Sequence, residues 1–283
     1  MIHTLNENDI PALLALSQSA GWEHTREDWR TLLLAGTACG HRDESGRPVS
    51  SLVVTEFGPR MAALGMLIVC QKNRRLGLAH DLMRHVIAGN RPTDRPLVLV
   101  AGSKVEGFYT PFGFKTVERI SKLQAPPGTQ VAGSGFADKI DLVPLDDANR
   151  MRMIGLDHQV HGYDRNRMLK VRLEQACVRQ VALKKGQETL LGYGAGVLQG
   201  EQLLLGPVIG FNLFTAQEMA AALMESHAGP VRIDVPHQRR DFIETLLASG
   251  FEELDQQPIM LLNATELPGR RDHVFALTSQ AWS

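Results

Sequence analysis

The turn within residues 67–79 is the first place where residue types and spacing suggest chemistry, because it is basic and contains glycine. An apolar run precedes the turn and a helical pattern follows it. The first N–H groups of a helix have no acceptor inside the helix, and the dipole adds positive charge, so such a junction binds phosphate. Gly77 and Ala79 keep the turn small, while Arg74 and Arg75 add charge. The turn predicts a phosphate site, with an ordinary solvated helix start as the alternative.

Two strands and a helix must position this turn. Residues 49–57 and 61–69 are mostly apolar runs on either side of Gly58-Pro59, and they predict a hairpin. The helix after the turn carries apolar residues at helical spacing and is expected to end at Gly89-Asn90. Its apolar face consists of Leu78, Leu82, Met83, Val86 and Ile87.

Two common phosphate-binding motifs do not occur at this turn. The P-loop string G-x-x-x-x-G-K-[ST] and the dinucleotide fingerprint G-x-G-x-x-G are both missing around Gly77. The segment instead resembles the pyrophosphate loop of the GNAT superfamily of acyl-CoA-dependent acyltransferases, roughly L-x-V-x-P-x-x-[RQ]-x-x-G-x-[GA]. The matching positions are Leu67, Val69, Gln71, Arg74, Gly77 and Ala79, with Gln71 where the family commonly has proline.

A second segment strengthens this resemblance. Residues 96–101 predict a short buried strand, and Phe108-Tyr109 follows it, four residues before Gly113-Phe114. This arrangement is similar to the second GNAT signature. The resemblance implies that two strands splay apart around the pantetheine arm of acyl-CoA, with the Tyr109 hydroxyl as the general acid for the departing sulfur. A buried core aromatic is the alternative for Tyr109.

The resemblance also assigns an acyl-CoA site, with a backbone N–H near Val69 polarising the acetyl carbonyl. The residues it assigns to this cofactor are Leu67, Val69, Arg74, Arg75, Leu76, Gly77, Leu78 and Ala79.

No residue stands out as the base that deprotonates the acceptor amine. Glu56, on the strand before the acyl-CoA strand, is a candidate, with a solvent-facing strand residue as the alternative. Glu23, His24 and Asp28 are further candidates, and a solvated loop with a helix cap is their alternative. The family's acceptor site lies after the first helix, so Trp22 is either a wall for the substrate or a core residue.

The chain divides into two halves that resemble one another, which predicts an α+β fold of two tandem GNAT-like domains. Each domain is expected to hold a mixed, mostly antiparallel sheet flanked by helices. The domains would span residues 1–123 and 138–283, joined by a linker at 124–137 that is rich in Pro, Gly and small residues.

The second half lacks the residues that matter for acyl-CoA in the first. No Arg-x-x-Gly turn follows Val208, and no tyrosine precedes Gly250-Phe251. The layout resembles bacterial tandem GNAT proteins with a catalytic N-terminal copy and a degenerate C-terminal copy.

Composition excludes several classes of protein. The 283 residues carry a net charge of −1, which gives no broad attraction for nucleic acid. No apolar run is long enough for a membrane span, and the N-terminal residues do not resemble a secretion signal. Cys39, Cys70 and Cys177 fit reduced thiols in the cytoplasm. His158 and His161 have metal-compatible spacing without companion ligands, so we expect no metal.

These observations predict an N-acyltransferase that moves an acetyl group from acetyl-CoA, as co-substrate, to a primary amine by direct transfer in a ternary complex. The acceptor would be a small-molecule amine or a protein amine. The alternative is a non-catalytic protein that senses acyl-CoA or another metabolite. In either case, the second half offers a surface for a homodimer.

Overall fold

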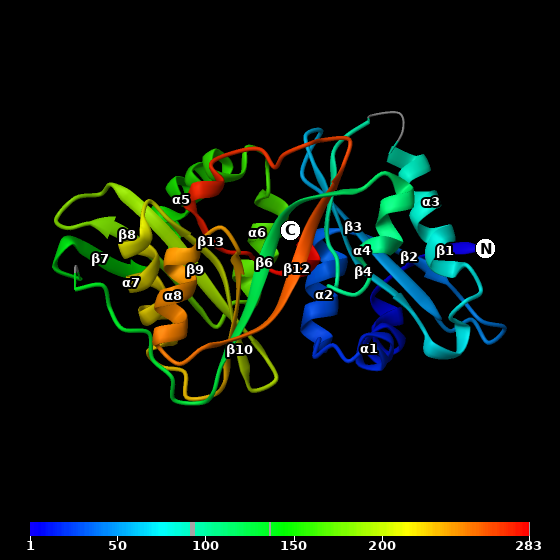
Figure 1. Cartoon of the computed structure of the whole chain (residues 1–283), viewed down its shortest axis with the longest axis horizontal. Helices are drawn as coiled ribbons and strands as arrows, with labels where there is room; N and C mark the ends of the chain where they lie inside the picture. Colours follow the sequence, from blue (N-terminus) through cyan, green and yellow to red (C-terminus); the bar gives the residue numbers. More distant parts are fainter. Residues whose placement is uncertain (91–93, 136, 283) are drawn as a thin grey trace.

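The computed structural model describes residues 1–90, 94–135 and 137–282, and within them a single 13-stranded sheet runs through both halves of the chain (Figure 1). The first half contributes β1 (Ile2–Leu5), β2 (Thr37–His41), β3 (Ser50–Glu56), β4 (Ala62–Val69), β5 (Leu97–Val100) and β6 (Lys115–Ala125). The second half contributes β7 (Ile140–Pro144), β8 (Val178–Lys184), β9 (Leu190–Gln199), β10 (Gln202–Gly210), β11 (Val231–Pro236), β12 (Glu252–Leu262) and β13 (Val274–Ala276).

The two halves exchange their sixth strands in the middle of the sheet. The strand order is β1-β2-β3-β4-β5-β12-β6-β11-β10-β9-β8-β7, with β13 paired to β10. Strand β12 of the second half therefore pairs with β5 of the first, and β6 of the first half pairs with β11 of the second. Figure 1 shows β6 and β12 side by side between the two halves, as their antiparallel register requires.

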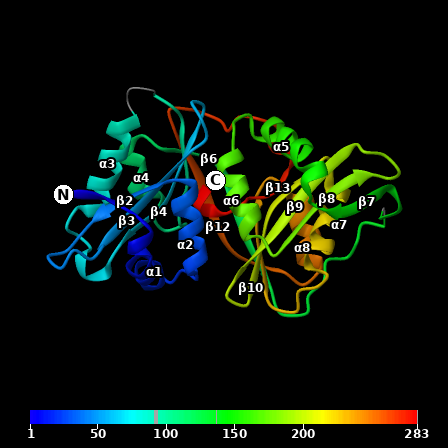
Figure 2. The ribbon, with the colours of Figure 1, turned by 180° about the vertical axis from the view of Figure 1, so that it is seen from behind.

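Helices cover both faces of this sheet (Figure 2). The first half forms α1 (Ile10–Ser19), α2 (Arg26–Ala35), α3 (Leu78–Asn90) and the short α4 (Glu106–Tyr109). The second half forms α5 (Asp147–His161), α6 (Asn166–Gln175), α7 (Leu213–Met224) and α8 (Arg240–Ala248). Among the described residues, no helix is both long and apolar enough to cross a membrane.

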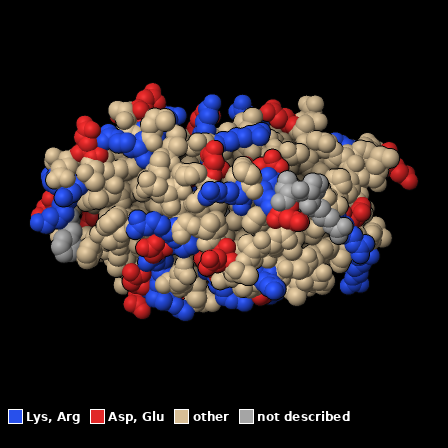
Figure 3. All heavy atoms as spheres, turned by 90° about the horizontal axis from the view of Figure 1, so that it is seen from above, with Lys and Arg blue, Asp and Glu red and all other residues tan. Residues whose placement is uncertain are grey.

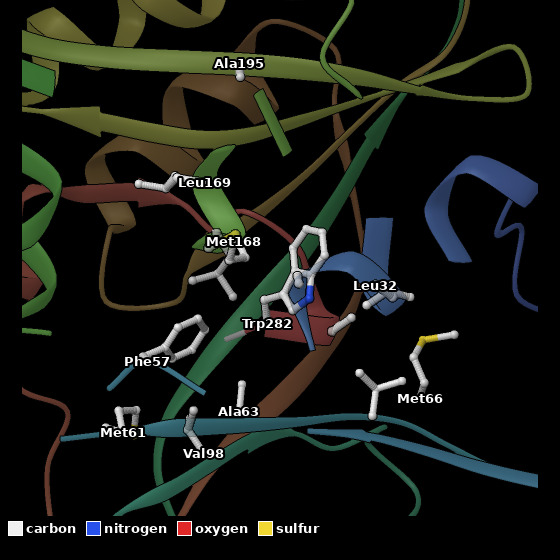
Figure 4. Packing of buried hydrophobic residues seen from close by; sticks show 14 of the residues in the cluster. Leu32, Phe57, Met61, Ala63, Met66, Val98, Met168, Leu169, Ala195 and Trp282 are labelled. Carbon is white, nitrogen blue, oxygen red and sulfur yellow. The ribbon is translucent and has the colours of Figure 1, made fainter. Parts of the chain in front are cut away.

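One hydrophobic core spans the two halves. Helices α1 and α2 of the first half and α5 and α6 of the second bury side chains in the same cluster. Figure 4 shows Trp282 in this cluster together with Leu32 of α2, Met66 of β4 and Met168 of α6. The side chain of Trp282 is 3% exposed, so truncation to alanine would cost roughly 3–5 kcal/mol of stability. Both halves thus depend on the C-terminal turn Gln280–Trp282.

The loop between α1 and α2 ends in a sequence-encoded cap. The Thr25 hydroxyl accepts from the N–H of Asp28 at 3.1 Å, and the Asp28 carboxylate accepts from the N–H of Thr25 at 2.7 Å. This capping box satisfies two N–H groups at the start of α2. It fixes where the preceding residues of the loop lie.

The α+β fold class predicted from the sequence is confirmed, with a mixed sheet flanked by helices. The predicted hairpin is β3–β4, and the predicted helix is α3, which ends at Asn90. The predicted linker begins too early, because Gln124 and Ala125 still belong to β6 and pair with β11. The alternation of buried and half-buried residues along β6 continues through these two positions. Phe136, within the predicted linker, lies outside the described residues.

The face of the molecule seen in Figure 3 carries acidic and basic side chains interspersed with one another. This mixture agrees with the net charge of −1.

Candidate active site

Strands β4 and β5 begin as a parallel pair and then separate. They pair only at Ala62–Leu97 and Ala63–Val98 among the described residues, although β4 continues to Val69. On its other side, β5 stays paired with β12 along its whole length. A wedge therefore opens between the two strands, as the resemblance predicted.

A β-bulge bends β4 where the wedge opens. The pairing of β3 with β4 shifts between Ser51–Ile68 and Val53–Gly65, so Met66 and Leu67 together oppose one residue of β3. Met66 has a φ of 54°, and its carbonyl accepts from the buried Ser51 hydroxyl at 2.8 Å. Bulges twist a strand locally and leave one residue without its ladder partner. The bulge therefore turns the second part of β4 away from β5.

The turn after β4 presents a run of backbone N–H groups. Among the described residues, no protein atom accepts from the N–H groups of residues 75–80. Arg75 and Gly77 have φ values of 66° and 78°, and the N–H of Asp81 is the first to return to the turn, on the Gly77 carbonyl at 3.0 Å. Positive φ at alternate positions gathers N–H groups into an anion-binding concavity. The turn therefore has the backbone geometry of a phosphate-binding site.

Side chains support this turn from both ends. Arg74 and Arg75 are exposed, and the Arg74 Nε donates to the Val69 carbonyl at 3.4 Å. On the other side, the His41 Nε2 lies 2.8 Å from the Asp81 carboxylate in the first turn of α3. The His41 Nδ1 lies 2.8 Å from the Ser50 hydroxyl. These contacts tie the start of α3 to β2 and β3.

Tyr109 ends α4 and lies behind the wedge. It shares a hydrophobic cluster with Leu64 of β4 and Leu99 of β5, and its ring centroid lies 5.0 Å from that of Phe108. The side chain is 9% exposed, and burial raises the pKa of Tyr109 to about 12, so its hydroxyl stays protonated at neutral pH. Among the described residues, the hydroxyl has no hydrogen-bond partner. It is available as a proton donor.

The structure brings together the predicted acyl-CoA residues but not the predicted base. Leu67 and Val69 line the β4 side of the wedge, and the turn with Arg74 follows directly. Glu56 lies opposite Ala62, at the far end of β4, roughly 20 Å from Val69 at about 3.3 Å per residue. Its carboxylate is 67% exposed and pairs with Arg95 at 2.8 Å. Glu56 faces solvent, because it belongs to the end of the hairpin away from the wedge.

Trp22 and His24 lie in the loop between α1 and α2. The Trp22 side chain is 39% exposed, and its ring packs edge-on against that of His24 at 5.7 Å. Asp28, the third residue of α2, caps that helix and also accepts from the amides of Gln175 and Gln199 in the second half. The loop therefore faces the second half across an open groove. The contacts of Asp28 come from residues far away in the chain, so local patterns carried no signal for them.

The second half closes its own version of the wedge. Strands β10 and β11 pair in parallel from Leu203–Val231 to Leu205–Ile233 and then separate. Strand β13 lies in the gap: it pairs with β10, and the N–H of Leu277 donates to the Asp234 carbonyl of β11 at 2.9 Å. A side chain at Gly206 would lie 1.9 Å from the Leu277 carbonyl. Strand β13 thus lies between β10 and β11, whereas in the first half the C-terminal turn Gln280–Trp282 packs against β4 and β5.

Comparisons with known proteins agree with this architecture. The model of the GNAT acetyltransferase domain matches residues 153–276, which lie in the second half. The uncharacterized N-acetyltransferase YitH of Bacillus subtilis is 26% identical over 98% of this chain and 96% of its own.

Two solved structures have the same fold over most of the chain. A candidate acetyltransferase from Pyrococcus horikoshii superposes with a TM-score of 0.78 at 16% identity, covering 100% of this chain and 95% of that one. A tandem GNAT protein from the clavulanic acid biosynthesis pathway superposes with a TM-score of 0.67 at 17% identity, over 92% and 97% of the chains. The second half thus matches a GNAT acetyltransferase domain, and the whole chain has the same fold as a tandem GNAT protein.

Proposed function

We propose that the protein transfers an acetyl group from acetyl-CoA to a primary amine, at a single site in the first half. The observation that carries this proposal is the run of unpartnered N–H groups at residues 75–80, beside the wedge between β4 and β5. The turn would hold the pyrophosphate, with charge from Arg74 and Arg75. The pantetheine arm would then lie in the wedge and reach toward Tyr109.

Leu67, Val69 and the residues of the turn would form the cofactor site. The chemistry that acetyl-CoA supplies is an activated acyl group. A backbone N–H of β4 near Val69 would donate to the carbonyl oxygen as negative charge develops there. The buried position of Tyr109 keeps its hydroxyl protonated for the departing sulfur.

The reaction balances without a metal or redox partner. An alkylamine with a pKa of about 10.4 arrives mostly protonated and first loses one proton to solvent. Its nitrogen then attacks the thioester carbonyl, so a C–N bond forms and the C–S bond breaks. The nitrogen releases a second proton, and the thiolate takes the proton of Tyr109, which is restored from solvent. The net products are an amide, a thiol and one proton.

The second half would bind no acetyl-CoA of its own and would instead support the site in the first half. Strand β13 in its wedge supports the interpretation that this copy is degenerate.

Cys39, Cys70 and Cys177 are all free thiols, which supports a cytoplasmic setting.

Replacing Tyr109 with phenylalanine tests the mechanism. Because the hydroxyl is lost but the ring stays, Tyr109→Phe should lower kcat by roughly 100-fold or more, with CoA affinity changed little. Free thiol release over a panel of amines measures the rate, and calorimetry measures CoA binding. Tyr163→Phe, which removes a hydroxyl from a buried tyrosine of the second half, is the matched control. An unchanged rate in Tyr109→Phe removes this residue from the mechanism, and CoA binding without turnover on any amine would favour a sensor.

A further inference from the structure

An open groove separates the α1–α2 loop from the β9–β10 hairpin, so each half of the molecule supplies one wall. Residues from α1, the loop, β6 and the hairpin line it: Gln18, Trp22, Glu23, Gln124, Glu201 and Gln202. The lining combines one half-exposed aromatic ring with neutral amides and two carboxylates. Gln199, which also lines the groove, donates to Asp28 at 3.2 Å and so links the two walls.

The central part of the shared sheet adjoins the groove, whose lining includes Gln124 of β6. Lys122 of β6 lies opposite Asp234 of β11 and Asp255 of β12, and directly opposite residues of antiparallel strands project from the same face. Lys122 also interacts electrostatically with Glu23 in the loop above. Arg232, two residues before Asp234 on the same face, pairs with its carboxylate at 2.9 Å. A charged patch built by three strands therefore lies next to the groove.

The C-terminal turn Gln280–Trp282 connects this charged patch to β4. The Asp234 carboxylate accepts from the Gln280 amide at 3.1 Å, and the next residue, Ala281, packs against Gly65 of β4. On β12, Pro258 accepts from the N–H of Ala101, just beyond the end of β5. The charged patch is thus connected to β4 through the C-terminal turn and to β5 through β12.

One buried polar atom of a groove-lining residue has no partner in the part of the chain that the structure describes. It is the Nδ1 of His24, in the loop. An unsatisfied buried polar group costs about 1–3 kcal/mol, so native proteins usually provide a partner for it. This atom supports the view that a ligand completes the groove.

The charges of the groove select for a cation. Among the described residues, its lining holds the carboxylates of Glu23 and Glu201 and no lysine or arginine, and the adjoining sheet carries Lys122 and Arg232. Burial lowers the pKa of His24, against the opposing effect of Asp28, so the imidazole adds no positive charge at neutral pH. Both cations have carboxylates beside them, so neither is available for the carboxylate of an amino acid.

We propose that this groove between the halves is the acceptor site, and that its ligand is a cationic, hydroxyl-rich amine of the amino-sugar class. Trp22 covers one face of the sugar ring, since aromatic rings pack well on such apolar faces. Gln18, Gln124 and Gln202 exchange hydrogen bonds with hydroxyl groups. The carboxylates attract the ammonium group. The inference rests on the proposed acetyl transfer and names its substrate class.

Direct binding separates this inference from the proposed function. Glucosamine, glutamate and putrescine are titrated into the CoA-loaded protein, and each is tested for acetylation. Glucosamine should bind at least 10-fold more tightly than the other two. Trp22→Ala and Glu201→Gln should each weaken its binding and raise its KM about 10-fold, with CoA affinity unchanged. Glu244→Gln is the matched control, because this exposed carboxylate lies on α8, whose buried residues cover the opposite face of the sheet.

Each outcome bears on the inference. Trp22 is at the surface, and a thermal melt confirms that its variant folds. Glucosamine binding that is lost in Trp22→Ala supports the groove even if no acetyl group is transferred, in which case only the proposed function fails. Acetylation of an amine whose KM is unchanged in both groove variants overturns the inference, as does preferred binding of glutamate.

Discussion

Individual residues around the turn after β4 decide whether it can hold phosphate. The motif Arg-x-x-Gly-x-Ala identified this turn in the sequence, and Arg75 and Gly77 both have positive φ in the structure. The motif did not predict the direction of the N–H groups, because that direction depends on a positive φ at Arg75, which non-glycine residues rarely adopt. Glu56 lies at the end of β3 that is away from the wedge. The sequence could not exclude it, because a position in a predicted strand does not show which end of that strand faces a ligand.

Gly77→Ala tests the turn at residue scale. A Cβ at this position meets no atom within 4 Å, so the change acts only through the left-handed backbone, which costs a non-glycine residue about 1–2 kcal/mol. If the turn relaxes, the N–H groups lose their alignment, and CoA affinity should fall about 10-fold by calorimetry. Gly186→Ala, at an equally open glycine with a φ of 65° in the β8–β9 hairpin, should leave CoA affinity unchanged. Equal CoA affinity in the two variants would remove the turn from the binding site.

At the scale of elements, a buried ion pair holds α5, α6 and β9 together. The Asp157 carboxylate of α5 accepts from Arg165, just before α6, at 2.7 Å, and from the Tyr193 hydroxyl of β9. Burial alone would raise the pKa of Asp157, but Arg165 and His161 reverse this and hold it well below its usual range. Removing one partner from such a pair leaves an uncompensated buried charge.

Asp157→Ala should therefore lower the free energy of unfolding by about 3–5 kcal/mol, measured by urea denaturation at pH 7. Since the folded-state pKa of Asp157 is depressed, its contribution is present above the unfolded pKa of about 3.9 and is lost as pH falls below it. The difference from wild type should thus shrink in acid. Asp147→Ala, at an exposed carboxylate in the first turn of the same helix, should cost well under 1 kcal/mol. A pH-independent difference for Asp157→Ala would contradict this account.

At the scale of the whole molecule, the two halves share one sheet and one hydrophobic core. Periodicity and motifs in the sequence predicted the hairpin β3–β4, helix α3 and the repeat itself, because those depend on local patterns. They did not predict the exchange of β6 and β12, since a strand's own alternation does not name its neighbours. The sequence did not predict the groove for the same reason: Trp22 and Gln202 both line it, although 180 positions separate them in the chain. Likewise, the short strand β13 carries no pattern that would place it between β10 and β11.

The central claim about the whole molecule is that it has one acetyl-CoA site, in the first half, because β13 fills the equivalent space in the second. Isothermal titration of CoA into the full chain measures this directly. We predict one site per chain, with affinity reduced at least 10-fold in Arg75→Glu, where a charge-assisted contact to phosphate is replaced by repulsion. Lys170→Glu, an equal charge change at an exposed position of α6, should bind CoA like the wild type. Two sites per chain, or undiminished binding in Arg75→Glu, would contradict the account.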